Sequence, residues 1–279
     1  MNYKIIRLSF LMFLMFNVTQ SFSQFGMLEG RRDILDPKGK TLIAIVNEDL
    51  AKGFNAEVLK NALTATWKLT PFKVVSQKEV QNNIDEYKGN SNYYFLTFAE
   101  KSAVGLSNVY LFLSNEINKK GEQSLLKTKT TIALCPILFM RDKDFSAELT
   151  LTMLQKFVGI DGRQVEELLN PDPSIIDKTL MIDDRYLHKK TEADIKKIYD
   201  SDFRLVNFNN LTKDEILNNK GVYYMTAVSG IPKEETAFYY VFDPIEKKFL
   251  FIHRLKGYGN YYHVNIDQLN RLLKKNLKK

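Results

Sequence analysis

Five ionisable side chains in the second half of the chain are of types that catalyse hydrolysis or ligate metals. Asp183 and Asp184 follow the apolar run TLMI, and the three histidines of the sequence are His188, His253 and His263. Aspartate and histidine transfer protons and bind metals, and the ends of strands bring such groups together. None of the local spacings matches a metal motif such as H-E-x-x-H. We predict no resident metal or cofactor, and a hydrolase or metal-binding enzyme with a site here is the alternative hypothesis.

A loop rich in tyrosine and glycine is the second candidate. The segment LKGYGNYYH (255–263) contains Tyr258, Tyr261, Tyr262 and His263. Tyrosine-rich loops anchor protein partners and stack on sugars, because a tyrosine gives a large contact area with little loss of entropy. The competing interpretation is a turn whose rings cover the edge of the core. Of the local features in the sequence, this loop is the one that we favour as a binding site.

Signatures of common enzyme classes are missing from the sequence. It contains no G-x-S-x-G, no Walker-type loop, no G-x-G-x-x-G and no kinase motif. The single cysteine, Cys135, lies in the apolar run TTIALCPIL, which predicts a buried structural thiol and excludes a disulfide within the chain. We therefore predict no catalytic residues, and enzymatic activity is the less favoured hypothesis.

The N-terminal residues have the pattern of a secretory signal peptide. Lys4 and Arg7 precede an apolar run over 11–16, and the small residues Ser21 and Ser23 follow it. This order predicts cleavage after Ser23 and a periplasmic or secreted protein with no transmembrane segment after cleavage. An uncleaved anchor is the competing interpretation, but the apolar run is shorter than the ~20 residues of a spanning helix.

The chain is mildly basic. The formal net charge is +7, and lysines and glutamates are spread along the sequence rather than clustered in blocks. An exported protein does not meet nucleic acid as its natural partner. If the charge contributes to binding, an acidic envelope polymer or an acidic protein surface fits it best, whereas ordinary solubility is the simpler explanation.

The first half of the chain has regularly alternating strand and helix patterns. The continuous apolar run TLIAIV (41–46) predicts a buried strand, and apolar residues at helical spacing over 54–67 predict a helix. FKVV follows as a strand, and Ser76 with Glu79 forms the capping-box pattern S-x-x-E before a second helix. NYYFLTFA (92–99), VYLFLS and TTIALCPIL predict three further strands before a closing helix.

The second half repeats this order of elements. TLMI (179–182) corresponds to TLIAIV, FRLV to FKVV, and Thr212 with Glu215 again forms a capping box. GVYYMTAVSG (221–230) corresponds to NYYFLTFA, with an offset of 130 residues that aligns Tyr94 with Tyr224. A hairpin and a terminal helix complete the second copy.

These patterns define the fold class and five segments. We predict an α/β (α+β) protein, formed by tandem duplication of a β-α-β-α-β-β-β-α unit, in which mixed sheets carry helices mainly on one face. The segments are a signal peptide (1–23), an N-terminal extension (24–40), a first copy (41–169), a proline-containing linker (170–177) and a second copy (178–279).

The order of elements in each copy resembles a known envelope domain. TLIAIV, the segment from Trp67 to Ser76, and NYYFLTFA are similar to the amino-terminal domain of the TolB family, whose fold also occurs in the curli secretion channel and related envelope lipoproteins. Those proteins usually join one such domain to another part, whereas two copies fill the chain here. A thioredoxin-like unit mixes similar elements, but the sequence has no C-x-x-C and implies no redox activity. The resemblance implies a non-enzymatic role, and we predict a binding or scaffold protein of the cell envelope with a protein partner.

Overall fold

The computed structural model describes most of both predicted copies. It describes residues 39–47, 49, 53–103, 106–121, 131–138, 140–158, 170–186, 192–197, 199, 201–229, 236–256, 269–271 and 273–274. The predicted signal peptide lies outside these residues. Among the residues described, no helix is both long and apolar enough to span a bilayer.

Ten strands and the helices between them follow the predicted order. The elements of the first half are β1 (Thr41–Val46), α2 (Ala56–Thr66), β2 (Phe72–Ser76), α3 (Gln77–Asn82), α4 (Ile84–Tyr87), β3 (Tyr93–Ala103), β4 (Leu106–Ser114), β5 (Thr131–Pro136) and α5 (Lys143–Val158). Those of the second half are η4 (Pro173–Asp177), β6 (Thr179–Asp183), η5 (Asp184–Tyr186), α7 (Glu192–Lys196), β7 (Phe203–Val206), η6 (Phe208–Asn210), α8 (Lys213–Asn218), β8 (Val222–Ser229), β9 (Thr236–Asp243) and β10 (Lys248–Lys256).

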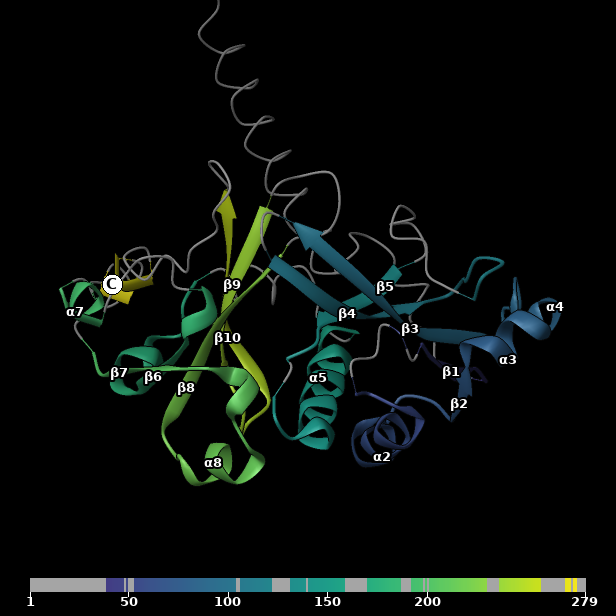
Figure 1. The fold of residues 1–279 in the computed structure, drawn as a ribbon, viewed down its shortest axis with the longest axis horizontal. Coiled ribbons are helices and arrows are strands. Elements are labelled where there is room, and N and C mark those ends of the chain that lie inside the picture. The colour runs from purple at the N-terminus through teal and green to yellow at the C-terminus, as the bar shows by residue number, and fades with distance from the viewer. Residues whose placement is uncertain are drawn as a thin grey trace, which may run out of the picture.

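The strands form two mixed sheets with the same topology (Figure 1). The order is β2-β1-β3-β4-β5 in the first sheet and β7-β6-β8-β9-β10 in the second. In each sheet the first three strands are parallel and the remaining pairings are antiparallel. The prediction of a mixed α/β fold is confirmed, and two sheets of equal order are consistent with an internal repeat.

An irregularity in the last pairing of each sheet also occurs at the same place. The register between β4 and β5 shifts at Ile132, which is left over between two paired neighbours. The register between β9 and β10 shifts at the equivalent residue, Leu250. Both side chains are buried. Such an inserted residue bends a strand and re-aims its side chain, so a shared bulge indicates that the two sheets have the same local geometry as well as the same order.

At the third strand, the alignment predicted from the sequence is wrong by one residue. Leu42 in β1 lies beside Tyr94, whereas the equivalent Leu180 in β6 lies beside Tyr223 rather than Tyr224. Both strands contain two consecutive tyrosines, so matching the residue types does not distinguish the two registers. A slip of one residue moves every side chain to the opposite face of the sheet, and burial therefore decides the register.

Strand β1 is apolar throughout because both of its faces are covered. Leu42 and Ala44 pack in the apolar cluster that contains α2 and α5, whereas Ile43 and Ile45 pack in a separate cluster with Val80 of α3. A strand buried on both faces has a continuous apolar run in place of alternation. The two long helices described in the first half therefore lie on one face of its sheet, and the short α3 and α4 lie on the other.

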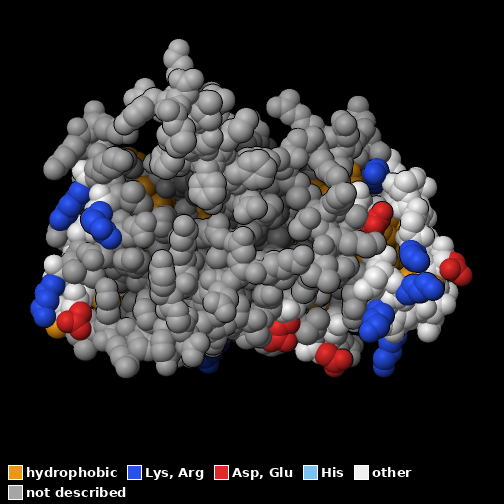
Figure 2. All heavy atoms as spheres, turned by 90° about the horizontal axis from the view of Figure 1, so that it is seen from above, with side chains coloured by type: hydrophobic (Ala, Val, Ile, Leu, Met, Phe, Trp, Pro, Cys, Tyr) orange, Lys and Arg blue, Asp and Glu red, His pale blue; other side chains and the backbone are white. Residues whose placement is uncertain are grey.

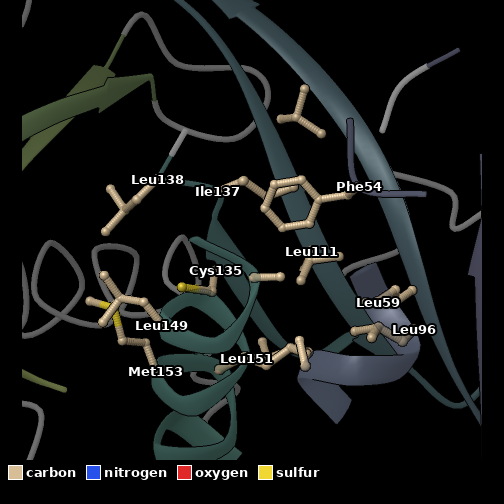
Figure 3. Packing of buried hydrophobic residues seen from close by; sticks show 14 of the residues in the cluster. Phe54, Leu59, Leu96, Leu111, Cys135, Ile137, Leu138, Leu149, Leu151 and Met153 are labelled. Atoms are coloured by element: carbon tan, nitrogen blue, oxygen red, sulfur yellow. The ribbon is translucent and has the colours of Figure 1, made fainter. Parts of the chain in front are cut away.

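Helix α5 lies between the two sheets and belongs to the core of both (Figure 1). Leu151 faces α2, whereas Leu149 and Met153 lie on the opposite side of the helix (Figure 3). The cluster that contains these residues extends into the second half through Met181, Phe208, Ile216, Tyr224, Tyr240, Phe242 and Ile252. Buried residues on two sides of α5 belong to this one cluster, and the two halves therefore share one continuous core.

The proline-containing linker is an ordered part of the second half. Residues of η4 form a 3₁₀ helix in which Ile175 is fully buried. The backbone N–H of Asp172 donates to the carbonyl oxygen of Leu250 at the edge of β10. The two prolines keep this segment out of α-helix and strand, as the sequence predicted, but the segment packs against the second sheet.

The two predicted capping boxes differ in completeness. At α8 the N–H of Glu215 donates to Thr212 Oγ1 (3.3 Å), and the N–H of Thr212 donates to Glu215 Oε2 (2.8 Å). At α3 the N–H of Glu79 donates to Ser76 Oγ, but the Glu79 carboxylate accepts from Lys73 Nζ instead of returning to the cap. Only the second box is therefore reciprocal.

We expect Thr212→Ala to lower the free energy of unfolding by about 1 kcal/mol, because it removes the acceptor for an N–H at the start of α8. The hydrogen bonds from Thr212 lower the pKa of Glu215. The bond from the Thr212 hydroxyl to the Glu215 carboxylate, which Thr212→Ala also removes, therefore contributes above the unfolded-state pKa of glutamate and is lost as the pH falls through the lower folded-state value. The backbone N–H of residue 212 still donates to Glu215 in the variant. Urea unfolding at pH 7 and at pH 3.5 measures both effects. An equal loss at the two pH values would contradict the linkage to Glu215.

Candidate functional site

The carboxyl ends of the parallel strands in the second sheet form the candidate site. After β6 the chain passes to α7, whose Ile195 packs on one face of the sheet. After β7 it passes to η6 and α8, whose Phe208 and Ile216 pack on the other face. Strand ends where the chain turns to opposite faces form the crevice in which open α/β proteins bind ligands. The polar residues at this edge are therefore the first to consider.

A buried carboxylate occupies this edge. Asp183, the last residue of β6, is fully buried. Its Oδ1 accepts from Arg185 Nε at 2.8 Å, and its Oδ2 accepts from Arg185 Nη2 at 2.5 Å and from Thr226 Oγ1 at 2.8 Å. Arg185 Nη1 donates to Asn209 Oδ1 at 2.7 Å. The guanidinium thus joins the end of β6 to the segment that follows β7.

This arrangement of hydrogen bonds fixes the end of β6 in place and is not suited to proton transfer. Both oxygens of Asp183 accept hydrogen bonds, and the guanidinium of Arg185 pairs with the carboxylate in a bidentate geometry. A carboxylate whose two oxygens are both engaged in this way has little capacity left for a metal ion or for a further proton donor. About a quarter of the Arg185 side chain is exposed to solvent (28%).

The equivalent position in the first sheet is apolar. By strand register, Ile45 corresponds to Asp183 and Thr97 to Thr226, and Asn47 follows where Arg185 stands in the second half. The Thr97 hydroxyl is buried and has no hydrogen-bond partner in the part of the chain that the structure describes. The polar cluster is therefore a feature of the second half alone.

Of the other residues of the predicted enzymatic site, the structure describes Asp184 and the backbone of His253. Asp184 is exposed in η5, next to the buried Asp183. His253 belongs to β10, three strands away from β6, which corresponds to roughly 14 Å at the usual strand spacing. His188 and His263 lie outside the described residues. Within the described ranges, no group of three or more histidines, cysteines or acidic residues could hold a metal ion.

The predicted binding loop also lies outside the described residues. Tyr258, Tyr261, Tyr262 and His263 follow the last described residue of β10, Lys256. Their binding role stays a prediction.

Sequence reasoning missed three members of the polar cluster, namely Arg185, Asn209 and Thr226. The signal for Arg185 was its position two residues after a strand-terminal aspartate, where a long side chain can reach back to the carboxylate. No short-range pattern links Asn209 or Thr226 to Asp183, because strand pairing brings them together. Only a correct order of β6, β7 and β8 would have predicted these contacts.

A small apolar pocket lies between the C-terminal ends of α2 and α5. Its volume is about 40 Å³, and its lining includes Trp67, Leu69, Tyr94 and Val158. Small-molecule sites usually have volumes of about 300 Å³ or more. The pocket therefore has room for a few methyl or methylene groups, not for a substrate or cofactor.

Charged residues are dispersed over the described surface. On the face shown in Figure 2, lysine and arginine side chains of the described residues lie at both ends of the molecule, with acidic side chains among them. Nucleic-acid-binding surfaces gather basic residues on one face or along one helix. The charged side chains of the described residues that are visible on this face do not gather in one basic patch, which fits the dispersed charge of the sequence.

The prediction of a buried cysteine is confirmed. Cys135 is 1% exposed, and it packs between β5 and α5 (Figure 3). Burial raises the pKa of its thiol, which suppresses the reactive thiolate.

We expect Cys135 to resist alkylation in the folded protein, because the reagent needs both access to the sulfur and a thiolate. Mass spectrometry after treatment with iodoacetamide at pH 8 measures this. The folded chain should stay unmodified over minutes, and the same chain in urea should be modified completely. Rapid labelling without urea would show that β5 opens locally.

Comparison with protein-family models, curated proteins and solved structures finds no match to this chain. The functional conclusion therefore rests on the sequence and the geometry. Those features are the Asp183 carboxylate, which is paired with Arg185 at the carboxyl ends of the parallel strands, the dispersed charge of the sequence, and two sheets that share one core.

Proposed function

We propose that the chain is a secreted or periplasmic, non-enzymatic binding or scaffold protein of the cell envelope. The observation that supports this most is the position of α5, which is buried between two sheets of equal topology and joins them into one core. Such a body presents the loops of both halves in a fixed arrangement, as a scaffold for contacts with other proteins requires. Export is the part of the proposal that rests on residues 1–23 alone.

The polar cluster favours binding over catalysis. A catalytic carboxylate needs a free oxygen, in hydrogen-bond reach of the group that it acts on. In Asp183 both oxygens are engaged by Arg185 and Thr226, and the register places the backbone of His253 three strands away. The side chains at this edge stabilise the ends of the strands, and in this proposal they support the surrounding loops.

The partner that we propose is an envelope protein or an acidic envelope polymer. The order of elements in each half is the one expected for a domain similar to the amino-terminal domain of TolB, whose relatives make protein contacts in the envelope. This analogy concerns the fold alone. The net charge, which is +7 for the full chain and +5 once Lys4 and Arg7 are removed with the predicted signal peptide, favours an acidic surface on the partner.

Crosslinking in the native envelope tests the proposal. A tagged full-length chain is expressed in its own host, the mature N-terminus is sequenced, and crosslinked proteins are identified and then bound again in purified form. We expect maturation at Gln24 and one reproducible partner that binds directly. The variant Tyr258→Ala/Tyr261→Ala/Tyr262→Ala should lose this partner, whereas Leu217→Ala, an exposed apolar residue of α8, should retain it.

Three outcomes would contradict parts of the proposal. An intact N-terminus in the cytoplasmic fraction would exclude export. Equal binding by the triple-tyrosine variant would move the contact surface away from the loop. The absence of any direct partner, together with a hydrolytic activity lost in His253→Ala, would replace the scaffold with the enzyme hypothesis.

A further inference from the structure

The turn between β9 and β10 contacts the far end of α5, across the boundary between the two halves. Lys156 donates from Nζ to the carbonyl oxygen of Glu246 at 2.8 Å and to that of Lys247 at 2.6 Å. Two turns earlier on the same helix, Glu148 Oε2 lies 3.8 Å from Lys247 Nζ. One helix of the first half therefore holds a short turn of the second half at two points.

The turn itself combines local support with a strained residue. Asp243 Oδ1 accepts from the N–H groups of Ile245 (2.8 Å) and Glu246 (3.0 Å), which closes the first part of the turn. Lys247 has a φ of 49°, and it is the only non-glycine residue with positive φ in the described part of the chain. The left-handed region costs an ordinary residue about 1 kcal/mol or more. The contacts from α5 to this turn can offset part of this cost.

The contact from Lys156 combines a favourable and an unfavourable effect. Its side chain is largely exposed, yet burial of the ammonium group against the turn lowers its pKa. Glu246 and Asp243 act in the opposite direction, whereas Lys247 and Lys248 add to the lowering. A partly desolvated charge of this kind adds little to overall stability, although its geometry is specific.

We infer that Lys156 is a clamp that selects one conformation of the turn between β9 and β10 without stabilising the fold as a whole. In the clamped state the carbonyl groups of Glu246 and Lys247 point to α5, and Lys247 stays in the left-handed region. In the released state these carbonyl groups turn to solvent and Lys247 relaxes. The clamp is thus a conformational device at the boundary between the two halves, and it does not depend on the proposed function.

Amide exchange in the full-length protein tests the clamp. Lys156→Met keeps the aliphatic stem and removes the donors, and Lys60→Met, an exposed lysine on α2, is the matched control. We expect the amides of Ile245 and Glu246 to exchange about fivefold faster in Lys156→Met, with the same Tm as the control. Unchanged exchange at these amides would overturn the inference. So would faster exchange along all of β9 and β10 together with a fall in Tm, because that result assigns Lys156 to global stability.

A second variant tests the role of Lys247. Glycine adopts positive φ without steric cost, so Lys247→Gly should reduce the need for the clamp. In Lys156→Met/Lys247→Gly, exchange at Ile245 and Glu246 should return towards the rate of the unmodified protein. Exchange as fast as in the single variant would show that the strain does not lie at Lys247.

Discussion

Replacing Asp183 with asparagine is expected to lower the free energy of unfolding by about 1.5 to 3 kcal/mol. The amide cannot accept the bidentate bond from Arg185, and its NH₂ group faces either the guanidinium or the Thr226 hydroxyl. The loss of the carboxylate leaves the Arg185 guanidinium without its partner, and the partial exposure of that side chain to solvent limits the cost. Urea unfolding followed by circular dichroism measures the loss. Asp184→Asn is the matched control, because Asp184 is the exposed neighbour, and it should change stability by less than about 0.5 kcal/mol.

The first half of the chain suggests a variant that tests whether stability depends on the charge pair or only on a side chain that fills the position of Asp183. Asp183→Ile/Arg185→Asn gives the second half the residues that Ile45 and Asn47 provide in the first. Replacement of a whole buried pair by an apolar residue is often neutral or stabilising. We therefore expect the double variant to be more stable than Asp183→Asn. A double variant that is equally unstable would show that the site cannot accept an apolar side chain, and would contradict the equivalence of the two strand ends.

Replacing Met153 with alanine should destabilise both halves of the molecule together. The side chain is buried on the side of α5 opposite to Leu151, in the cluster that joins the two sheets. Truncation of a buried methionine costs about 2 to 5 kcal/mol. Because the core is shared, the loss should appear as one cooperative transition at lower urea concentration.

The single tryptophan makes this measurement specific to one half. Trp67 lies at the end of α2 in the first half, so its fluorescence follows that half, whereas circular dichroism follows the whole chain. Coincident curves indicate a single transition. Leu217→Ala, on the exposed side of α8, should leave both curves in place. Two separated transitions for Met153→Ala would show that the halves unfold independently and that α5 belongs to only one of them.

The sequence predicted the helices and strands better than the contacts between them. The runs TLIAIV and TLMI predicted buried strands because a strand covered on both faces has no alternation, and β1 and β6 are such strands. Capping patterns located the starts of α3 and α8, because a cap is a contact within four residues. Local chemistry of this kind is visible in one sequence.

Contacts between distant segments were the part that could not be predicted. The sequence predicted a closing helix in the first half, but not that residues of the second half pack in the same cluster with it. The predicted register at the third strand failed because two consecutive tyrosines match in either alignment. Asp183 was singled out from the sequence, but its partner Thr226 is 43 residues away and reaches it only through the pairing of β6 with β8.

The shared position of α5 has a consequence for the order in which the chain becomes available during synthesis. The ribosome releases the first sheet and α5 before any strand of the second sheet exists. Until the second sheet has been synthesised, the side of α5 that carries Leu149 and Met153 is an exposed apolar surface that can associate with other chains. The first half is therefore an incomplete folding intermediate until the second half has been synthesised. A truncated chain that ends before β6 is a target for chaperones, proteases or self-association.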